Sequence, residues 1–132
     1  ASDWSSDVCS SDLGRMATHI AAEDAALPVD GLVLLAYPFH PPGKPEKRRD
    51  AHLPRVRRPM LVVQGTRDTF GGPDEIGPVF AALSPPADIH PVEGGDHSFK
   101  VARAGREGQA AIDTAIRARV AAWIGDVVAR GE

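Results

Sequence analysis

Two short segments of the chain each place a chemically active side chain directly after an apolar run. Residues 59–68 read Pro-Met-Leu-Val-Val-Gln-Gly-Thr-Arg-Asp, so the run 60–63 ends in a glycine turn that delivers Asp68. Residues 94–99, Gly-Gly-Asp-His-Ser-Phe, follow a second short run and deliver His97. A carboxylate that accepts the Nδ1–H of an imidazole leaves Nε2 available as a general base. An Asp followed along the chain by a His matches the second half of a Ser–Asp–His triad.

The elements expected around these two residues alternate between helix and strand. Helices are predicted over 15–27, from 71 until Pro85 and Pro86, and over 105–130, and strands over 29–37, 60–63 and 88–92. The last helix spaces Ile112, Ile116, Val120, Trp123 and Val127 three or four residues apart, which predicts an apolar stripe lying on a sheet. This order predicts an α/β fold with three layers, α/β/α, around a parallel sheet.

The carboxyl ends of parallel strands meet at one edge of a sheet, where ligands and catalytic groups gather. We therefore expect Asp68 and His97 to lie side by side, with Arg67 pointing away from the Asp68 carboxylate. The alternatives for Asp68 are that it caps a turn or pairs with Arg67.

Composition and charge narrow the class of protein. The 132 residues are 42% hydrophobic and 25% charged, which is typical of one soluble globular domain. A net charge of -3 argues against binding to nucleic acid. The single cysteine, Cys9, excludes an internal disulfide and favours a reducing cytoplasm. The apolar runs are too short to cross a membrane, and the first residues do not resemble a signal peptide.

The other histidines and the basic residues suggest less specific roles. His19 is interpreted as a surface residue of a helix, and His40, His52 and His90 have no partner in the sequence comparable to that of His97. No His/Cys spacing matches a zinc site, so neither a metal nor a cofactor is expected. The basic stretch 44–58 is interpreted as a solvated loop or short helix, with an anion-binding lid as the alternative.

Residues 1–13 differ in composition from the rest of the chain. They are rich in Ser and Asp and have no apolar period, which favours a disordered terminus. Alternatively the segment is not native, because residues 7–13 resemble translated sequencing-adapter sequence; residues 14–132 would then be a partial domain. Only three strands are visible, and the exposed edge of such a thin sheet predicts self-association.

Several motifs together resemble proteins of the α/β-hydrolase fold. They are Gly-Arg-Met-Ala at 14–17, Tyr-Pro at 37–38, His-Pro-Pro-Gly-Lys-Pro-Glu at 40–46, Gly-Thr-Arg-Asp at 65–68 and Gly-Asp-His-Ser-Phe at 95–99. The chain is most similar to the bacterial dienelactone-hydrolase-like branch, which is related to the testis-expressed and NSL-complex-subunit hydrolase-like domain. The resemblance implies the C-terminal half of an α/β-hydrolase fold, with Asp68 as the acid and His97 as the base of a triad.

The nucleophile elbow of this family, Gly-x-Ser-x-Gly-Gly-Arg-Met-Ala, would end at residues 14–17. In that register Ser11 stands at the nucleophile, while Cys9 and Leu13 stand where the strained turn requires glycines. We interpret Ser11 as a coincidence of register and expect the chain to be inactive as given.

Two functions follow from these observations. The first is a hydrolase acting on a small ester, lactone or acyl substrate. The second is a non-catalytic hydrolase-like scaffold that binds partners.

Overall fold

The computed structural model describes residues 11–24 and 26–130, without the side chains of residues 11–13. Its elements are α2 (Ser11–Glu23), β1 (Leu32–Leu35), the 3-10 helix η1 (Leu53–Arg55), β2 (Met60–Gly65), α3 (Pro73–Ala81), β3 (Asp88–Val92) and α4 (Gly105–Arg130). The predictions made for residues 1–10, Cys9 among them, lie outside the described residues.

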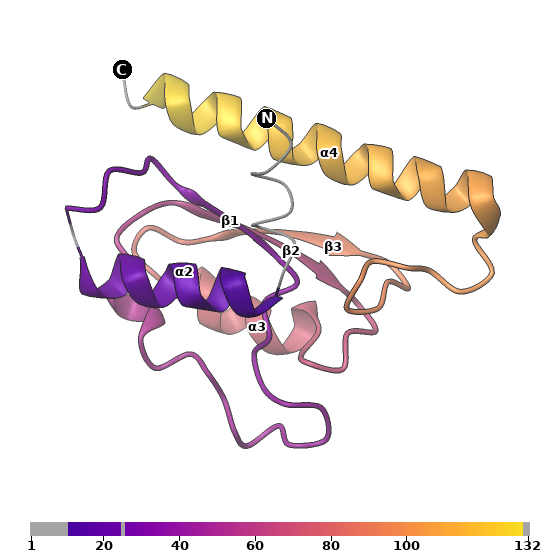
Figure 1. Ribbon diagram of the computed structural model, residues 1–132, viewed down its shortest axis with the longest axis horizontal. Coiled ribbons are helices and arrows are strands. Elements are labelled where there is room, and N and C mark those ends of the chain that lie inside the picture. The colour runs from indigo at the N-terminus through magenta and orange to yellow at the C-terminus, as the bar shows by residue number, and fades with distance from the viewer. Residues whose placement is uncertain (1–10, 25, 131–132) are drawn as a thin grey trace.

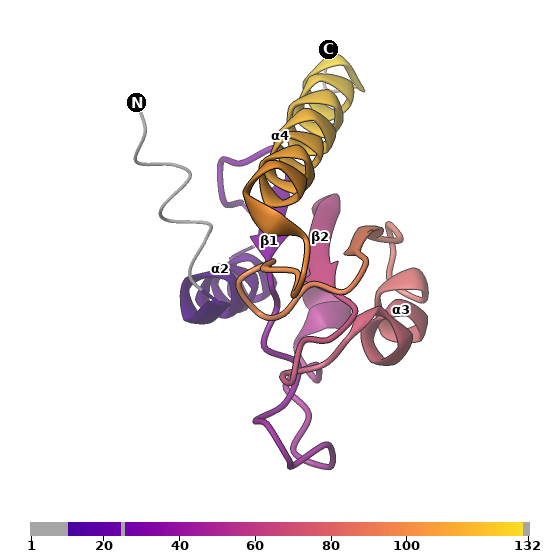
Figure 2. The same ribbon diagram turned by 90° about the vertical axis from the view of Figure 1, so that its right-hand side faces the viewer.

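The described strands form one parallel sheet in the order β1-β2-β3. The central strand β2 is buried along its whole length, as its uninterrupted apolar run predicts. Helix α4 lies across one face of the sheet, and α2 and α3 cover the other (Figures 1 and 2). The predicted three-layer α/β/α architecture with a parallel sheet is confirmed.

Alternate residues of the strands face two separate apolar clusters. Leu34 and Val62 point into the cluster beneath α2 and α3, whereas Leu61 and Val63 point toward α4. The α4 residues of that second cluster are Ile116, Val120, Trp123 and Val127, so the apolar stripe does lie on the sheet. Burial of each such side chain contributes about 1.5–3 kcal/mol to the stability of the folded state.

The ends of several elements differ from the prediction. Helix α2 begins at Ser11 and ends at Glu23, because Asp24 accepts the backbone N–H of Ala26 and closes a turn there. Strand β1 ends at Leu35, since Ala36 takes a positive φ of 65° that no strand continues. Strand β2 extends to Gly65, which pairs with Val92 of β3. The bounds predicted for β3 and α4 are those observed.

Candidate active site

The loops after β2 and β3 are tied together by their backbones. The N–H of Thr66 donates to the carbonyl of Val92 at 3.0 Å, and the N–H of Arg67 donates to the carbonyl of Gly95 at 2.9 Å. Gly65 is needed here, because a Cβ at this position would overlap the carbonyl oxygens of Gly95 and Asp96. This close approach of two backbones fixes the relative position of the residues that follow.

Asp68 is held at the end of β2 by donors on both carboxylate oxygens. Its side chain is fully buried. Oδ1 accepts the backbone N–H of Phe70 at 2.8 Å, and Oδ2 accepts a bond from the side-chain amide of Gln64 at 3.2 Å. A buried carboxylate with this many donors is fixed in orientation.

His97 is presented by a tight loop stabilised by its neighbour. Asp96 Oδ1 accepts the backbone N–H groups of Ser98 at 2.8 Å and Lys100 at 3.0 Å. The hydrogen bond from Lys100 is the main cause that lowers the pKa of Asp96. The imidazole packs against the ring of Phe70, with centroids 4.2 Å apart, and its side chain is 25% exposed.

The predicted juxtaposition of Asp68 and His97 is observed. Nδ1 of His97 lies 2.7 Å from Oδ2 of Asp68, within hydrogen-bond distance. Since a carboxylate only accepts, Nδ1 donates in this bond, and in the neutral form of the imidazole Nε2 is then an acceptor. Nε2 is buried and has no hydrogen-bond partner among the described residues. The pair therefore has the geometry of a general base with its orienting acid.

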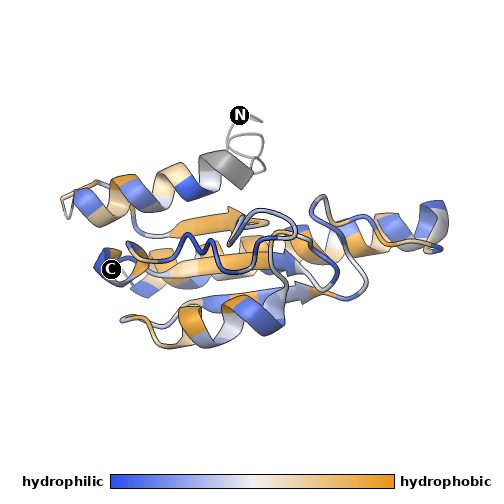
Figure 3. Cartoon of the chain, turned by 90° about the horizontal axis from the view of Figure 1, so that it is seen from below, coloured by the Kyte–Doolittle hydropathy of each residue, from blue (hydrophilic) through white to orange (hydrophobic). Residues whose placement is uncertain are grey.

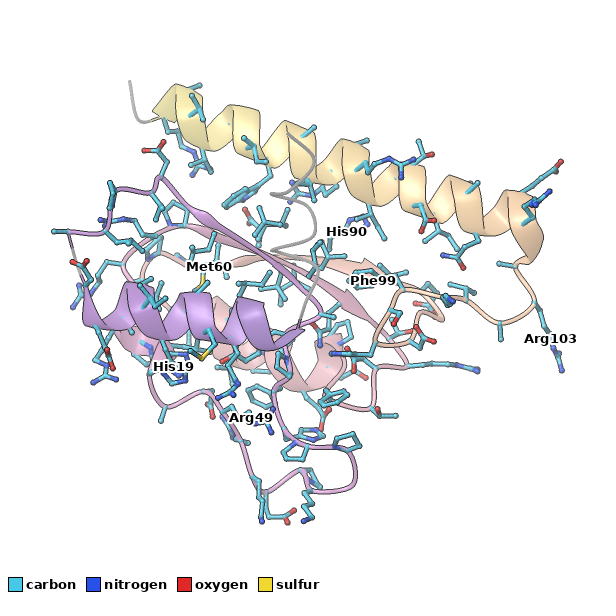
Figure 4. All side chains as sticks on the ribbon, in the orientation of Figure 1. His19, Arg49, Met60, His90, Phe99 and Arg103 are labelled. Carbon is cyan, nitrogen blue, oxygen red and sulfur yellow. The ribbon has the colours of Figure 1, made fainter. Side chains whose placement is uncertain are left out.

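Arg67 does not compete for the carboxylate, as predicted. Among the described residues no ion pair joins it to Asp68; instead Arg67 lines a separate hollow of about 400 Å³ with Gly94 and Arg103. Arg103 extends outward from the chain just before α4 (Figure 4).

Gln64 is a site residue that sequence reasoning missed. This fully buried side chain accepts the N–H of Tyr37 at 2.9 Å through Oε1. Its Nε2 lies 2.9 Å from the carbonyl of Tyr37, 2.6 Å from that of Gly71, and 3.2 Å from Asp68. The available signal in the sequence was that Gln64 is the one polar residue in the otherwise apolar run before Gly65. Gln64 joins three segments around the acid.

His40 also has a partner, contrary to the sequence interpretation. Its Nδ1 lies 2.8 Å from the carbonyl of Pro41, and its Nε2 lies 3.1 Å from the Glu75 carboxylate. Both partners are acceptors, so only the imidazolium satisfies both bonds. The bond to Pro41, followed by that to Glu75, raises the pKa of His40. Sequence reasoning missed this pair because a loop meets a helix that lies far along the chain.

His19 and His52 form a second histidine contact that was not expected. Their rings stack with centroids 3.6 Å apart, and Nε2 of His52 lies 2.7 Å from the Thr18 hydroxyl. That hydroxyl donates to the carbonyl of Arg15, so His52 donates to Thr18. Burial lowers the pKa of His52 to about 4. His19 thus points from α2 toward the segment that holds η1 rather than into solvent alone (Figure 4).

The basic stretch 44–58 is partly neutralised. Arg48 and Asp50 form an exposed ion pair at 2.6 Å, and Arg58 donates to the carbonyls of Val29 and Leu27. Among the described residues, no group of three possible ligands could hold a metal ion. None of the described helices combines the length and apolarity that crossing a bilayer requires.

Ser11, the nucleophile position by register alone, is the first residue of α2, and its side chain lies outside the described part of the structure. The assignment of Ser11 therefore stays a prediction. Residues 11–125 match the family of the alpha/beta hydrolase domain. The chain belongs to this family, as its motifs led us to expect.

Proposed function

We propose that the intact protein is a serine hydrolase of the dienelactone-hydrolase-like branch that acts on a small ester, lactone or acyl substrate in the bacterial cytoplasm, and that this chain, with its nucleophile elbow replaced, is inactive as given. The observation that carries this proposal is the bond of 2.7 Å between His97 Nδ1 and Asp68 Oδ2, which leaves a buried Nε2 without a partner among the described residues. That is the arrangement in which an imidazole takes a proton from a serine hydroxyl.

The chemistry assigns a separate task to each residue. Nε2 of His97 takes the proton of the serine as its oxygen attacks the substrate carbonyl, and returns that proton to the leaving group. The Asp68 carboxylate holds the ring in the required tautomer and stabilises the imidazolium. Ser11, at the start of α2, stands at the position of the family's nucleophile by register alone, and we propose it as the serine only in a chain whose elbow glycines are restored.

The residues at the nucleophile elbow of this chain are incompatible with the strained turn that activity requires. Cys9 and Leu13 carry side chains at the two positions where the turn requires glycines. Misplacing the nucleophile or losing an oxyanion donor each lowers the rate by orders of magnitude. We therefore expect the chain to show no hydrolysis of p-nitrophenyl acetate above buffer.

Restoring the elbow tests the proposal. The double variant Cys9→Gly with Leu13→Gly should gain covalent labelling at Ser11 by an alkyl fluorophosphonate, identified by peptide mass spectrometry. Labelling should be lost in the same background with Ser11→Ala and fall at least tenfold with His97→Ala. A folded double variant that is not labelled would overturn the assignment of Ser11, and labelling that is independent of His97 would overturn the proposed role of His97 as the base.

A non-catalytic scaffold is the second candidate, and the replaced elbow residues Cys9 and Leu13 favour it. The discriminating observation is the genomic DNA upstream of the Gly14 codon. A verified reading frame that encodes Gly-x-Ser-x-Gly there supports the enzyme, whereas one without a serine supports the scaffold.

A further inference from the structure

His40 is the last buried residue before a long segment at the surface of the molecule. It is 5% exposed, whereas none of residues 41–51 is buried. Figures 2 and 3 place the segment between α2 and α3, and Figure 3 shows it as mostly hydrophilic. Because few apolar side chains anchor this segment, the bonds of the His40 ring to Pro41 and Glu75 hold its beginning in place.

The backbone at His40 is joined to the turn that follows Asp68. The N–H of His40 donates to the carbonyl of Phe70 at 3.0 Å. The next residue of that turn, Gly71, also lies close to this segment, since a Cβ at Gly71 would be 2.9 Å from the Cβ of Phe39. A displacement of His40 would therefore also move Phe70.

Phe70 contacts both members of the Asp68–His97 pair. Its N–H donates to Asp68 Oδ1 at 2.8 Å, and its ring lies on the imidazole of His97, with centroids 4.2 Å apart and planes at 31°. The bond from Nδ1 to Asp68 fixes one atom of the imidazole, and the contact with Phe70 fixes the plane of the ring. An aromatic face also attracts a cation, which His97 becomes when it takes a proton.

We propose that His40 is a positioning residue for His97 and acts through Phe70. The bonds of the His40 ring hold the segment to which Phe70 is joined, and the ring of Phe70 holds the imidazole of His97. The inference rests on the proposed role of His97 as the base, but each of its contacts is present in the chain as given. It also assigns a task to the motif at 40–46, which the triad does not use.

The positioning requires a proton on both ring nitrogens of His40, because Pro41 and Glu75 each present an acceptor. The bond to Pro41 raises the pKa of His40 most, burial opposes it, and the carboxylates of Glu75 and Asp68 raise it further. Both bonds are therefore present below this pKa, and one of them is lost as the pH rises through it. The contact between Phe70 and His97 should loosen over the same interval.

Proton NMR of the full chain tests the inference, and it needs no catalytic activity. The ring current of Phe70 should shift the carbon-bound imidazole protons of His97 upfield, and Phe70→Leu should abolish this shift. Protonation of His97, beside Asp68 and Asp96, also moves these signals. The contribution of Phe70 is therefore the difference between the unmodified chain and Phe70→Leu at each pH. It should decrease with the same midpoint as the titration of the His40 ring.

A matched pair of variants in the first turn of α3 isolates the partner of His40. Glu75→Gln keeps an acceptor for His40 and for the N–H of Gly72 but removes the charge. It should move the loss of the upfield shift to lower pH, together with the titration of His40. Asp74→Asn removes the same charge at the adjacent exposed position and should leave that midpoint unchanged.

His40→Ala removes both ring bonds and keeps the backbone N–H that binds Phe70. The folded variant should lack the upfield shift of His97 at every pH. If this substitution at a buried position prevents folding, Glu75→Gln decides the question, because the Glu75 side chain is 44% exposed.

Three results would contradict the inference. They are a Phe70 contribution that does not change as His40 titrates, a folded His40→Ala variant that keeps the upfield shift, and a midpoint that Glu75→Gln does not move. The labelling of Ser11 tests the hydrolase proposal separately, so the failure of either proposal is distinguished from failure of the other.

Discussion

The side-chain amide of Gln64 lies 3.2 Å from the same Asp68 oxygen that accepts the imidazole N–H of His97. The same amide holds the backbone of Tyr37 at the end of β1 and that of Gly71 beyond the turn. Gln64 thus positions Asp68 by fixing the loops on either side of it.

Replacing Gln64 by methionine should destabilise the protein despite the similar volume. The N–H and carbonyl of Tyr37 and the carbonyl of Gly71 would lose their partner in a buried site, and buried unpaired groups are costly. We expect a loss of about 2–4 kcal/mol in the free energy of unfolding, measured with urea. A loss smaller than the error of extrapolating the unfolding free energy to zero urea would show that this hydrogen-bond network contributes little to stability.

Gly65→Ala should be among the most damaging small substitutions in the chain. The added methyl would meet the carbonyl oxygens of Gly95 and Asp96, which are backbone atoms that cannot turn aside. We expect a cost of about 2–4 kcal/mol in unfolding free energy.

The matched control for Gly65 is Gly125→Ala in α4, where nothing lies within 4 Å of the added atom. That substitution should stabilise the helix by about 0.5–1 kcal/mol. Similar effects at the two glycines would argue against the close backbone approach that ties the two loops.

Lowering the pH should reduce the free energy of unfolding through His52. Burial lowers its pKa from 6.5 to about 4, so between these values the unfolded chain binds a proton that the folded chain does not. The contribution of His52 is therefore present above pH 6.5 and is lost as the pH falls toward 4, by about 2–3 kcal/mol.

The His52→Asn variant should flatten the dependence of unfolding free energy on pH in this interval. His90→Asn is the control: burial lowers the pKa of His90 as well, but this residue is only half-buried, so most of the slope should remain. An unchanged slope in His52→Asn would mean that another group carries the acid sensitivity.

The parts of the fold that depend on local patterns were predictable from the sequence. The apolar run of β2 is unbroken, as expected for a strand buried on both faces, and the apolar stripe of α4 repeats with the helical period. Asp68 and His97 follow strands whose ends must meet. The start of α2 was not predicted, because residues around Ser11 have no apolar period.

Long-range polar contacts were beyond sequence reasoning. His40 and Glu75 are 35 residues apart, and no spacing rule links a loop imidazole to a carboxylate in the first turn of α3, which also accepts the backbone N–H of Gly72. In the sequence Gln64 only marks the end of an apolar strand. Its hydrogen bonds depend on how β1 and the turn at Gly71 are placed around it, which the sequence does not give.

The central claim is that Asp68 orients His97 so that Nε2 serves as the base. Nitrogen-15 NMR of the imidazole tests it most directly, because the two ring nitrogens give distinct shifts when protonated and when free. We predict that neutral His97 carries its proton on Nδ1, with a downfield proton resonance that disappears in Asp68→Asn. A neutral ring protonated on Nε2, or a spectrum unchanged by Asp68→Asn, would contradict the account.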